Sequence, residues 1–272
     1  MRPESVPHPL NLNALLKASY IVCATPRSGS SFLCEALTRS KIAGRPDEYF
    51  LHWYRADYKP QELDVYGKAA CALPLADYVA KLIAERTQNG VFGVKIMQEY
   101  FEFVVTKLRS LTGSKSQSTH EVLESFFPNL HYIYVERRDK LLQAVSLAKA
   151  IQSNEWESYW HTPFIRFYKT FTGSGPRLSY DFPLISSCYD MVCSHSRLWE
   201  DYFRQSGIEP FRIDYESLVD SYDETLRQIM DQLKIPCARN WVFDKPSIKK
   251  QRNTLNDEWA ARFLKDSKLQ SS

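Results

Sequence analysis

The chain has 272 residues, and 44% of them are hydrophobic, so it can bury a sizeable core and is not a disordered chain. The 35 Lys and Arg against 32 Asp and Glu give a formal net charge of +3, a balance that argues against a nucleic-acid partner. No window approaches the roughly 20 apolar residues that span a bilayer, and the N-terminus lacks the pattern of a signal peptide. The six cysteines show no metal-ligand spacing, so we expect a soluble cytoplasmic protein without disulfides or a metal site.

Short apolar runs alternate with helical patterns along the chain. After a lead-in over residues 1–18, with a short helix over 10–17, we expect strands at 20–24, 91–96, 131–135 and 211–214 and helices at 31–40, 75–86, 140–152, 189–205 and 222–233. This alternation predicts a single α/β domain over residues 1–272, with a parallel sheet flanked by helices on both faces. Two stretches break the rhythm: a loop is expected at 111–119, and an irregular aromatic-rich insertion at 153–181, which could be a lid, a dimer arm or part of a binding site.

The first strand leads into a loop with the composition of an anion site. Ser28, Ser30 and Ser31 supply hydroxyl donors, Gly29 lets the backbone wrap tightly, and Arg27 supplies a planar cationic fork. Because the loop lies between a buried strand and the start of a helix, backbone N–H groups and the helix dipole converge there. The alternative is that one of the serines merely caps the helix.

The type of anion follows from what the loop lacks. A nucleotide-hydrolysing P-loop needs GxxxxGK[ST], and here no Lys follows the Gly. A loop that binds a nucleotide 5′ phosphate without metal fits better, as sulfuryl transfer from 3′-phosphoadenosine 5′-phosphosulfate requires. A small-molecule kinase and a non-catalytic nucleotide-binding module remain as alternatives.

Several motifs resemble one known family. YIVCATPRSGSSFLCEAL, AGRPDEYF, FGVKIM, RRDKLLQAVSLAKAIQSNEW and KKQRNTLNDEWAARF follow one another along the chain. In this order they resemble the bacterial trehalose 2-sulfotransferase-like family. The resemblance implies a P-loop-like sulfotransferase fold, the 3′-phosphoadenosine donor, a carbohydrate or glycolipid hydroxyl as acceptor, and a homodimer. A trehalose-like disaccharide is one candidate acceptor.

Two further segments are candidates for the donor's second phosphate. Arg137 and Arg138 follow the third strand at the sheet edge where open α/β sheets place ligands, and Ser146 lies about two turns into the next helix. Arg137 is the better candidate of the two arginines by the resemblance, and an exposed arginine pair is the alternative. The resemblance also brings Lys250 and Gln251 to the donor's phosphate side, whereas basic residues near a chain end are often only solvated.

The acceptor side centres on a carboxylate. Transfer to a hydroxyl benefits from a general base, and Glu48, held in a loop after Pro46, is the candidate that the resemblance also implies; Asp47 is its neighbouring rival. Lys95, at the end of the second strand, would neutralise the transferring sulfuryl group or anchor the acceptor. The family usually places Trp where this chain has Gln98, so the acceptor need not be trehalose.

Aromatic side chains follow the carboxylate. Tyr49, Phe50 and Trp53 are candidates to stack on the sugar, and a packed lid or a dimer contact is the alternative.

Overall fold

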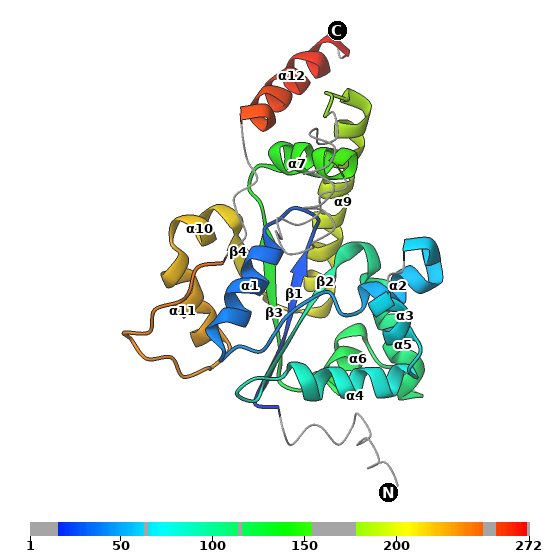
Figure 1. Ribbon diagram of the computed structural model, residues 1–272, viewed down its shortest axis with the longest axis vertical. Helices are drawn as coiled ribbons and strands as arrows, with labels where there is room; N and C mark the ends of the chain where they lie inside the picture. The colour runs from blue at the N-terminus through cyan, green and yellow to red at the C-terminus, as the bar shows by residue number, and fades with distance from the viewer. Residues whose placement is uncertain (1–15, 63–64, 114–115, 154–177, 247–253, 271–272) are drawn as a thin grey trace, which may run out of the picture.

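Four parallel strands form the centre of the protein, seen in a computed structural model that describes residues 16–62, 65–113, 116–153, 178–246 and 254–270. The strands are β1 (Ala18–Ala24), β2 (Val91–Met97), β3 (Leu130–Glu136) and β4 (Phe211–Asp214), in the order β2-β1-β3-β4 (Figure 1). β1 pairs with β2 on one side and β3 on the other, and it is buried along its whole length. The predicted parallel sheet is confirmed.

Helices surround this sheet. They are α1 (Ser30–Ser40), α2 (Leu51–Tyr58), α3 (Val65–Cys71), α4 (Leu75–Arg86), α5 (Phe101–Thr112), α6 (Thr119–Phe126), α7 (Lys140–Ser153), α9 (Phe182–Ser206), α10 (Tyr215–Asp220), α11 (Tyr222–Gln232) and α12 (Thr254–Gln270). Short 3-10 turns, η2 (Pro60–Glu62) and η3 (Gln98–Tyr100), join some of them. No helix of the described residues is both long and apolar enough to cross a bilayer.

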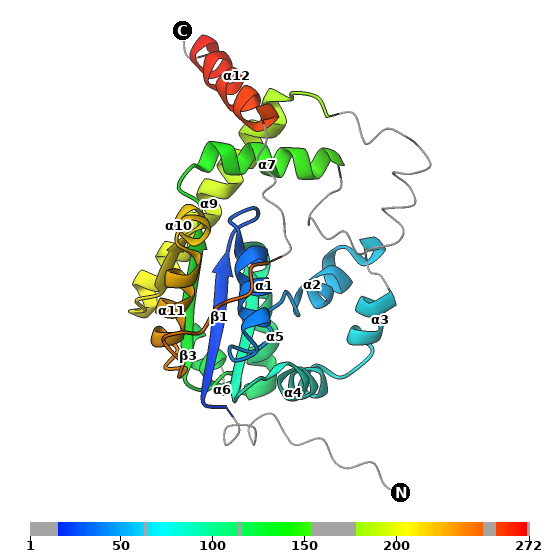
Figure 2. The same ribbon diagram turned by 60° about the vertical axis from the view of Figure 1, so that its left-hand side comes forward.

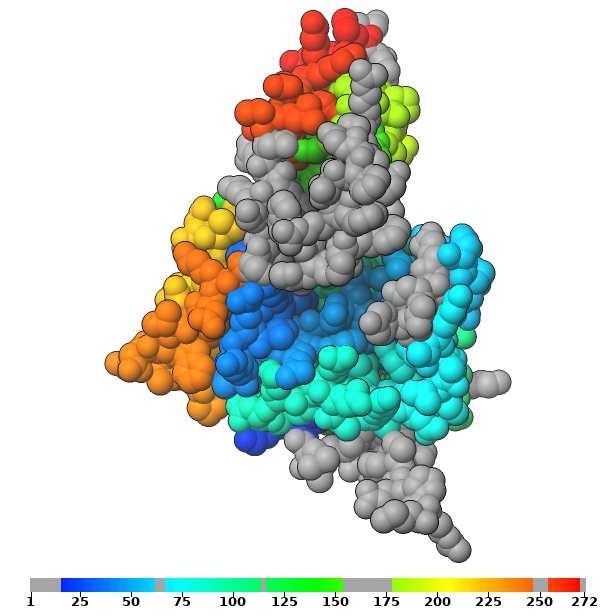
Figure 3. All heavy atoms as spheres, viewed as in Figure 1, coloured from blue at the N-terminus to red at the C-terminus, as the bar shows by residue number. Residues whose placement is uncertain are grey.

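The alternation of side chains along β1 sorts the helices onto two faces, as predicted. Tyr20 and Val22 pack with α1, α10 and α11 in one core cluster. Ile21 and Cys23 pack with α4, α5, α6 and part of α9 in the other. Figure 3 views the side on which the surface of α1 is exposed next to the segment that holds α4 and β2.

A third cluster lies beyond the carboxyl ends of the strands. Val145 of α7, Cys188 of α9 and Trp259 of α12 are its centre. Figures 1 and 2 show α7 and α12 across this end of the sheet, with α9 running from there along the strands. The three helices therefore form a layer above the edge where the candidate loop lies.

Two predicted boundaries are wrong. The expected loop at 111–119 is partly helical, because α5 continues to Thr112 and α6 begins at Thr119 after a capping box between Ser118 and Glu121. The helix expected from residue 189 begins at Phe182, since Asp181 caps its N-terminus by accepting the N–H of Leu184 at 2.9 Å. The lead-in helix expected over 10–17 falls almost entirely outside the described residues.

Candidate functional site

The loop between β1 and α1 has the conformation of an anion cradle. Arg27 and Gly29 both have positive φ, 64° and 94°, which curls the backbone around the helix N-terminus. Gly29 is the N-cap of α1 and provides no side-chain cap, so the first-turn N–H groups are not satisfied by a neighbouring serine. The geometry therefore favours the anion site over the alternative of a serine cap.

Glycine is required at position 29 for a second reason. A Cβ on Gly29 would lie 2.3 Å from Cδ2 of Tyr215, which begins α10. The Tyr215 ring also lies 5.7 Å from the guanidinium carbon of Arg137. α10 thus closes the loop from the side of β4, and sequence reasoning missed Tyr215 because no motif marks it.

Helix α7 holds the loop from above. The buried amide of Gln143 donates to Oγ1 of Thr25 at 2.9 Å and to the carbonyl of Pro26 at 2.7 Å. Nε of Arg27 donates to Oγ of Ser146 at 3.1 Å. The sequence grouped Ser146 with Arg137, whereas the structure brings Ser146 to the Arg27 loop; Gln143, one turn before it, was missed.

A second cation lies near this contact. Nζ of Lys149 donates to Oδ1 of Asn256, a buried residue of α12, at 2.5 Å. Burial, followed by the positive charge of Arg27, lowers the pKa of Lys149. The ends of Arg27 and Lys149 therefore repel each other, an arrangement that a bound anion would stabilise.

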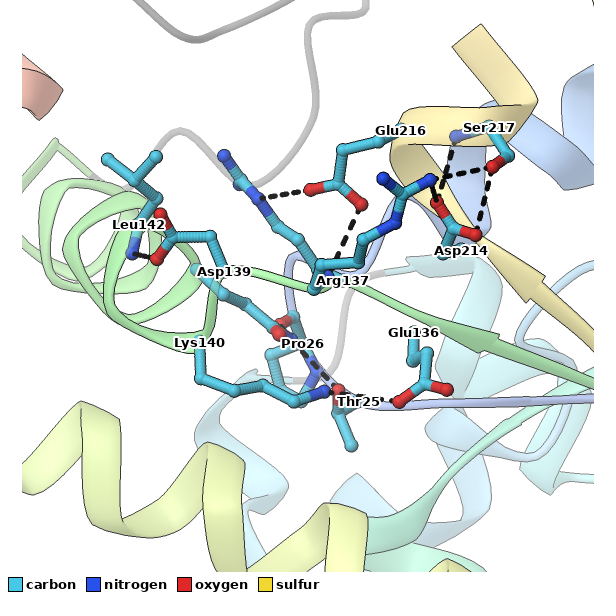
Figure 4. Close-up of polar contacts among 12 residues, drawn as sticks. Thr25, Pro26, Glu136, Arg137, Asp139, Lys140, Leu142, Asp214, Glu216 and Ser217 are labelled. Atoms are coloured by element: carbon cyan, nitrogen blue, oxygen red, sulfur yellow. Dashed lines mark hydrogen bonds and ion pairs between the residues drawn. The ribbon is translucent and has the colours of Figure 1, made fainter. Parts of the chain in front are cut away.

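The two arginines after β3 are turned toward α10. Figure 4 shows Arg137 facing Glu216, with 3.9 Å between its Nε and Oε1, and Arg137 is only 7% exposed. Arg138 is more exposed, and its Nη2 lies 2.5 Å from Oδ1 of Asp214 and 2.8 Å from Oγ of Ser217. The structure places both at the carboxyl edge of the sheet, where Arg137 faces Glu216 and Arg138 contacts Asp214 and Ser217.

A buried ion pair links the acceptor candidate to the loop. Nζ of Lys95 lies 2.8 Å from Oε1 of Glu48 and donates to Oγ of Ser31 at 3.1 Å, while the Tyr100 hydroxyl donates to Oε2 of Glu48 at 3.0 Å. The Lys95 side chain is 2% exposed and that of Glu48 is 18% exposed. Two of the three predicted catalytic residues, Lys95 and Glu48, are thus in contact with each other, and Lys95 also contacts the first turn of α1. Tyr100 was missed, since nothing in the sequence connects it to Glu48.

Electrostatics fix the protonation of the groups around Glu48. Burial is the largest single effect and lowers the pKa of Lys95, but the charge and hydrogen bond of Glu48, together with Cys34 and Asp47, outweigh it, so the pKa is raised above its ordinary value. Burial, followed by the charge of Glu48, raises the pKa of the Tyr100 hydroxyl well above its usual range. Lys95 is therefore an ammonium and Tyr100 a neutral donor at neutral pH.

The backbone holds this carboxylate in place. The carbonyl of Asp47 accepts the N–H of Lys95 at 3.0 Å, and Oδ1 of Asp47 accepts the N–H of Glu48 at 2.8 Å. The segment that carries Glu48 is thus attached to β2 by a main-chain bond. Asp47 is exposed and orients its neighbour, whereas Glu48 points to Lys95.

The aromatic side chains after Glu48 are largely packed. Phe50 is 1% exposed in the core, so the structure does not bring its ring to the surface of the site. The Tyr49 hydroxyl donates to the carbonyl of Arg45, and the Tyr78 hydroxyl donates to the carbonyl of Tyr49 at 2.6 Å. The rings of Trp53 and Tyr78 are 5.7 Å apart. Packing within the protein accounts for Phe50, while Tyr49 and Trp53 stay predicted acceptor contacts.

Some predicted residues cannot be placed. Lys250 and Gln251, and most of the aromatic insertion, lie outside the described residues. Among the described residues, no group of three His, Cys, Asp or Glu side chains is arranged to hold a metal ion.

A parallel sheet with a curled loop at its carboxyl edge, leading into a helix without a side-chain cap, defines an α/β protein of the P-loop-like type. The family model described as Stf0 sulphotransferase matches residues 19–266, so the chain belongs to this family and is a sulfotransferase. The resemblance stated from the motifs is confirmed by this match.

Curated relatives and solved structures resemble the chain over most of its length. It is 26% identical to the trehalose 2-sulfotransferase of Mycolicibacterium smegmatis in an alignment 270 positions long that covers 91% of this chain and 95% of the relative. It is 24% identical to the trehalose 2-sulfotransferase of Mycobacterium tuberculosis in an alignment 266 positions long that covers 90% of this chain and 93% of the relative. The crystal structure of a sulfotransferase from Alicyclobacillus acidocaldarius aligns with a TM-score of 0.47 at 12% identity, covering 92% of each chain.

The ion pair generates a prediction about stability. Glu48→Gln leaves the Lys95 ammonium buried without its carboxylate, so we expect the free energy of unfolding to fall by about 3 kcal/mol. The pKa of Lys95 is higher in the folded protein than in the unfolded chain. The ion pair therefore contributes its full stabilisation at any pH below the pKa of the unfolded chain, and this stabilisation is lost only as the pH rises through the pKa of the folded protein. The loss should therefore be the same at about pH 6 and about pH 9, measured by urea denaturation.

Asp57→Asn is the matched control. Asp57 and Lys107 form a pair of similar length, 2.7 Å, but both side chains are partly exposed, at 42% and 34%. Its loss should cost less than about 1 kcal/mol. Equal losses in the two variants would show that the Glu48 pair is no more than a surface contact.

Proposed function

We propose that the enzyme transfers the sulfuryl group of 3′-phosphoadenosine 5′-phosphosulfate to a hydroxyl of a carbohydrate or glycolipid, without a metal ion. One observation carries the proposal: Lys95 contacts Ser31 of the anion loop at 3.1 Å and the Glu48 carboxylate at 2.8 Å. A group held by the loop and a hydroxyl facing Glu48 would meet at this ammonium. The names of the two curated relatives support trehalose or a similar disaccharide as acceptor.

The loop and its neighbours fit the donor's 5′ end. Arg27 and the first-turn N–H groups of α1 are suited to phosphate and sulfate oxygens. The Ser28 hydroxyl is fully buried in the loop and has no hydrogen-bond partner among the described residues, so it can serve an anion drawn into the loop. Ser30 and Ser31 begin the helix at the same place.

The 3′ phosphate would bind at the neighbouring edge. Arg137 or Arg138 and Ser146 are the proposed residues, with Lys250 and Gln251 closing over the phosphates. The Lys149 ammonium, near Arg27 and one turn beyond Ser146, adds a further cation on that side. The concentration of cations at one end of β1 and β3 supports a ligand with two separate anionic groups.

In the proposed reaction Glu48 removes a proton from the acceptor, while Lys95 and Arg27 stabilise negative charge. The acceptor oxygen attacks sulfur as the bond from sulfur to the phosphate oxygen breaks, and the electron pair leaves with adenosine 3′,5′-bisphosphate. Glu48 takes the acceptor's proton, since each carboxylate oxygen retains a lone pair beyond its contact with Lys95 or Tyr100. Lys95 and Arg27 stabilise the charge on the transferring group and the leaving phosphate.

Two properties of the whole molecule also stay proposals. The six cysteines all lie in the described part of the chain and none forms a disulfide there, which supports a reducing, cytoplasmic setting. A homodimer is implied by the family resemblance alone.

The direct test of the function is transfer itself. Purified enzyme with the sulfated donor should add the mass of one sulfuryl group to a member of a panel of disaccharides and glycolipids, with chelator present. Transfer only with ATP and magnesium would instead establish a kinase. A panel that stays unmodified with every donor would contradict the proposed function.

The donor assignment predicts a preference between two nucleotides. Adenosine 3′,5′-bisphosphate should raise the melting temperature more than adenosine 5′-phosphate at equal concentration, because donors arranged for the 3′ phosphate are left unpaired by the analogue that lacks it. Ser146→Ala and Arg137→Ala should reduce the difference, whereas Arg204→Ala, on the exposed far end of α9, should not. Equal stabilisation of the wild-type protein by both nucleotides would overturn the assignment.

The general base predicts a loss in turnover. Glu48→Gln keeps the shape of the side chain but cannot accept a proton, so kcat should fall by about 10²–10⁴ while the affinity for adenosine 3′,5′-bisphosphate changes little. Asp47→Asn is the neighbouring control, and its kcat should fall far less because its carboxylate only accepts the N–H of Glu48. Full activity of Glu48→Gln under conditions where it is folded would remove Glu48 as the base.

A further inference from the structure

A cavity of about 480 Å³ lies between α1, the end of α4 and β2. Its walls come from α1, the segment of residues 45–49 and the turn after α4. Ser31 and Lys95 are among its lining residues. Figure 3 views this side of the molecule, where α1 adjoins the segment of α4 and β2. The volume is in the range of sites for small ligands.

Cations dominate the wall of this cavity. Lys41, Arg45 and Arg86 line it, and none of the three forms an ion pair with a carboxylate of the described residues. The two acidic lining residues are already engaged. Glu35 pairs with Arg39 at 2.9 Å, and Asp47 accepts the N–H of Glu48. The cavity therefore carries an excess of positive charge, since the cations that line it outnumber the carboxylates.

Two of these cations are held in position. With the Gln88 amide turned so that both of its groups are satisfied, its oxygen accepts from Nε of Arg45 at 2.9 Å and its nitrogen donates to the carbonyl of Gly44 at 3.1 Å. The guanidinium of Arg86 lies 5.6 Å from the centre of the Tyr49 ring. A planar guanidinium that is already oriented loses less entropy when it binds an oxyanion in two-point fashion.

The cavity reaches the reacting centre. Its lining residues include Lys95, whose ammonium contacts the Glu48 carboxylate at 2.8 Å. A sugar that presents a hydroxyl to Glu48 can therefore extend a second group past Lys95 toward Arg45 and Arg86. A neutral sugar would leave these cations without an anionic partner.

We propose that this cavity binds an anionic substituent of the acceptor, so that the preferred substrate is a phosphorylated or carboxylated sugar rather than a neutral one. The inference rests on the proposed function, because it concerns the acceptor of that reaction. Arg45 and Arg86 are specificity-determining residues, and Lys41 adds charge at the rim.

The test compares three acceptors that differ in charge: trehalose, trehalose 6-phosphate and a disaccharide that contains glucuronic acid. We expect kcat/KM to be about tenfold or more higher for at least one anionic acceptor than for trehalose. Arg45→Met and Arg86→Met should each reduce that ratio toward one. Lys81→Met removes a cation from the exposed face of α4, outside the cavity, and should leave the ratio unchanged. The comparison between trehalose 6-phosphate and the disaccharide that contains glucuronic acid shows whether the cavity prefers a phosphate or a carboxylate.

A binding measurement separates this inference from the proposed function. Titration calorimetry with trehalose 6-phosphate and trehalose uses enzyme saturated with adenosine 3′,5′-bisphosphate, so that the donor loop is not available to the sugar phosphate. Tighter binding of the phosphorylated sugar, weakened by Arg45→Met, supports the inference even if no transfer occurs. Transfer to trehalose with no preference for either anionic acceptor, or equal binding of the two sugars, would overturn the inference and leave the proposed function standing.

Discussion

The ammonium of Lys95 is the interaction on which the rest of the site depends. It is 1% exposed, and a charge so deeply buried is stable only when it is paired and hydrogen-bonded. The contact joins three parts of the chain: β2 supplies Lys95, the first turn of α1 supplies Ser31, and the segment after α1 supplies Glu48. The same contact that offsets the burial of the charge therefore fixes the carboxylate relative to the anion loop.

The cations of the site form two groups, one near the anion loop and one in the cavity next to α1. Arg27 and the arginines after β3 lie at the carboxyl end of the strands, and Lys149 belongs to α7, which crosses this end of the sheet (Figure 2). Arg45 and Arg86 lie on the far side of Lys95, in the cavity next to α1. Two cationic regions separated by one ion pair suit a reaction in which both the donor and the acceptor bring negative charge. The chain's small net charge of +3 conceals this local concentration.

Much of this arrangement could be predicted from sequence. The unbroken apolar runs predict parallel strands because both faces of such a sheet are covered, and parallel strands bring their following loops to one edge. That rule is why Arg27 and Arg137, more than 100 residues apart, could be assigned to one site. Glu48 and Lys95 were both assigned to the site of transfer, but their direct contact was not predicted.

Side-chain pairing could not be predicted in the same way. The positive φ of Arg27 turns its side chain to Ser146, and no residue pattern indicates a left-handed conformation for an arginine. Phe50 was a candidate to stack on the sugar, with a packed lid or a dimer contact as the alternative, and the structure directs its ring to the core where α2 begins. The single-domain organisation and the roles of the site residues stay predictions.

The most direct test of the account is a double-mutant cycle on kcat with Lys95→Met and Glu48→Gln, measured at saturating donor and acceptor. If the two residues act as one unit beside the reacting groups, the double variant should be no slower than the more impaired single variant. Losses that multiply would mean that Lys95 and Glu48 act independently, and would contradict the claim that this buried pair joins the two sides of the site.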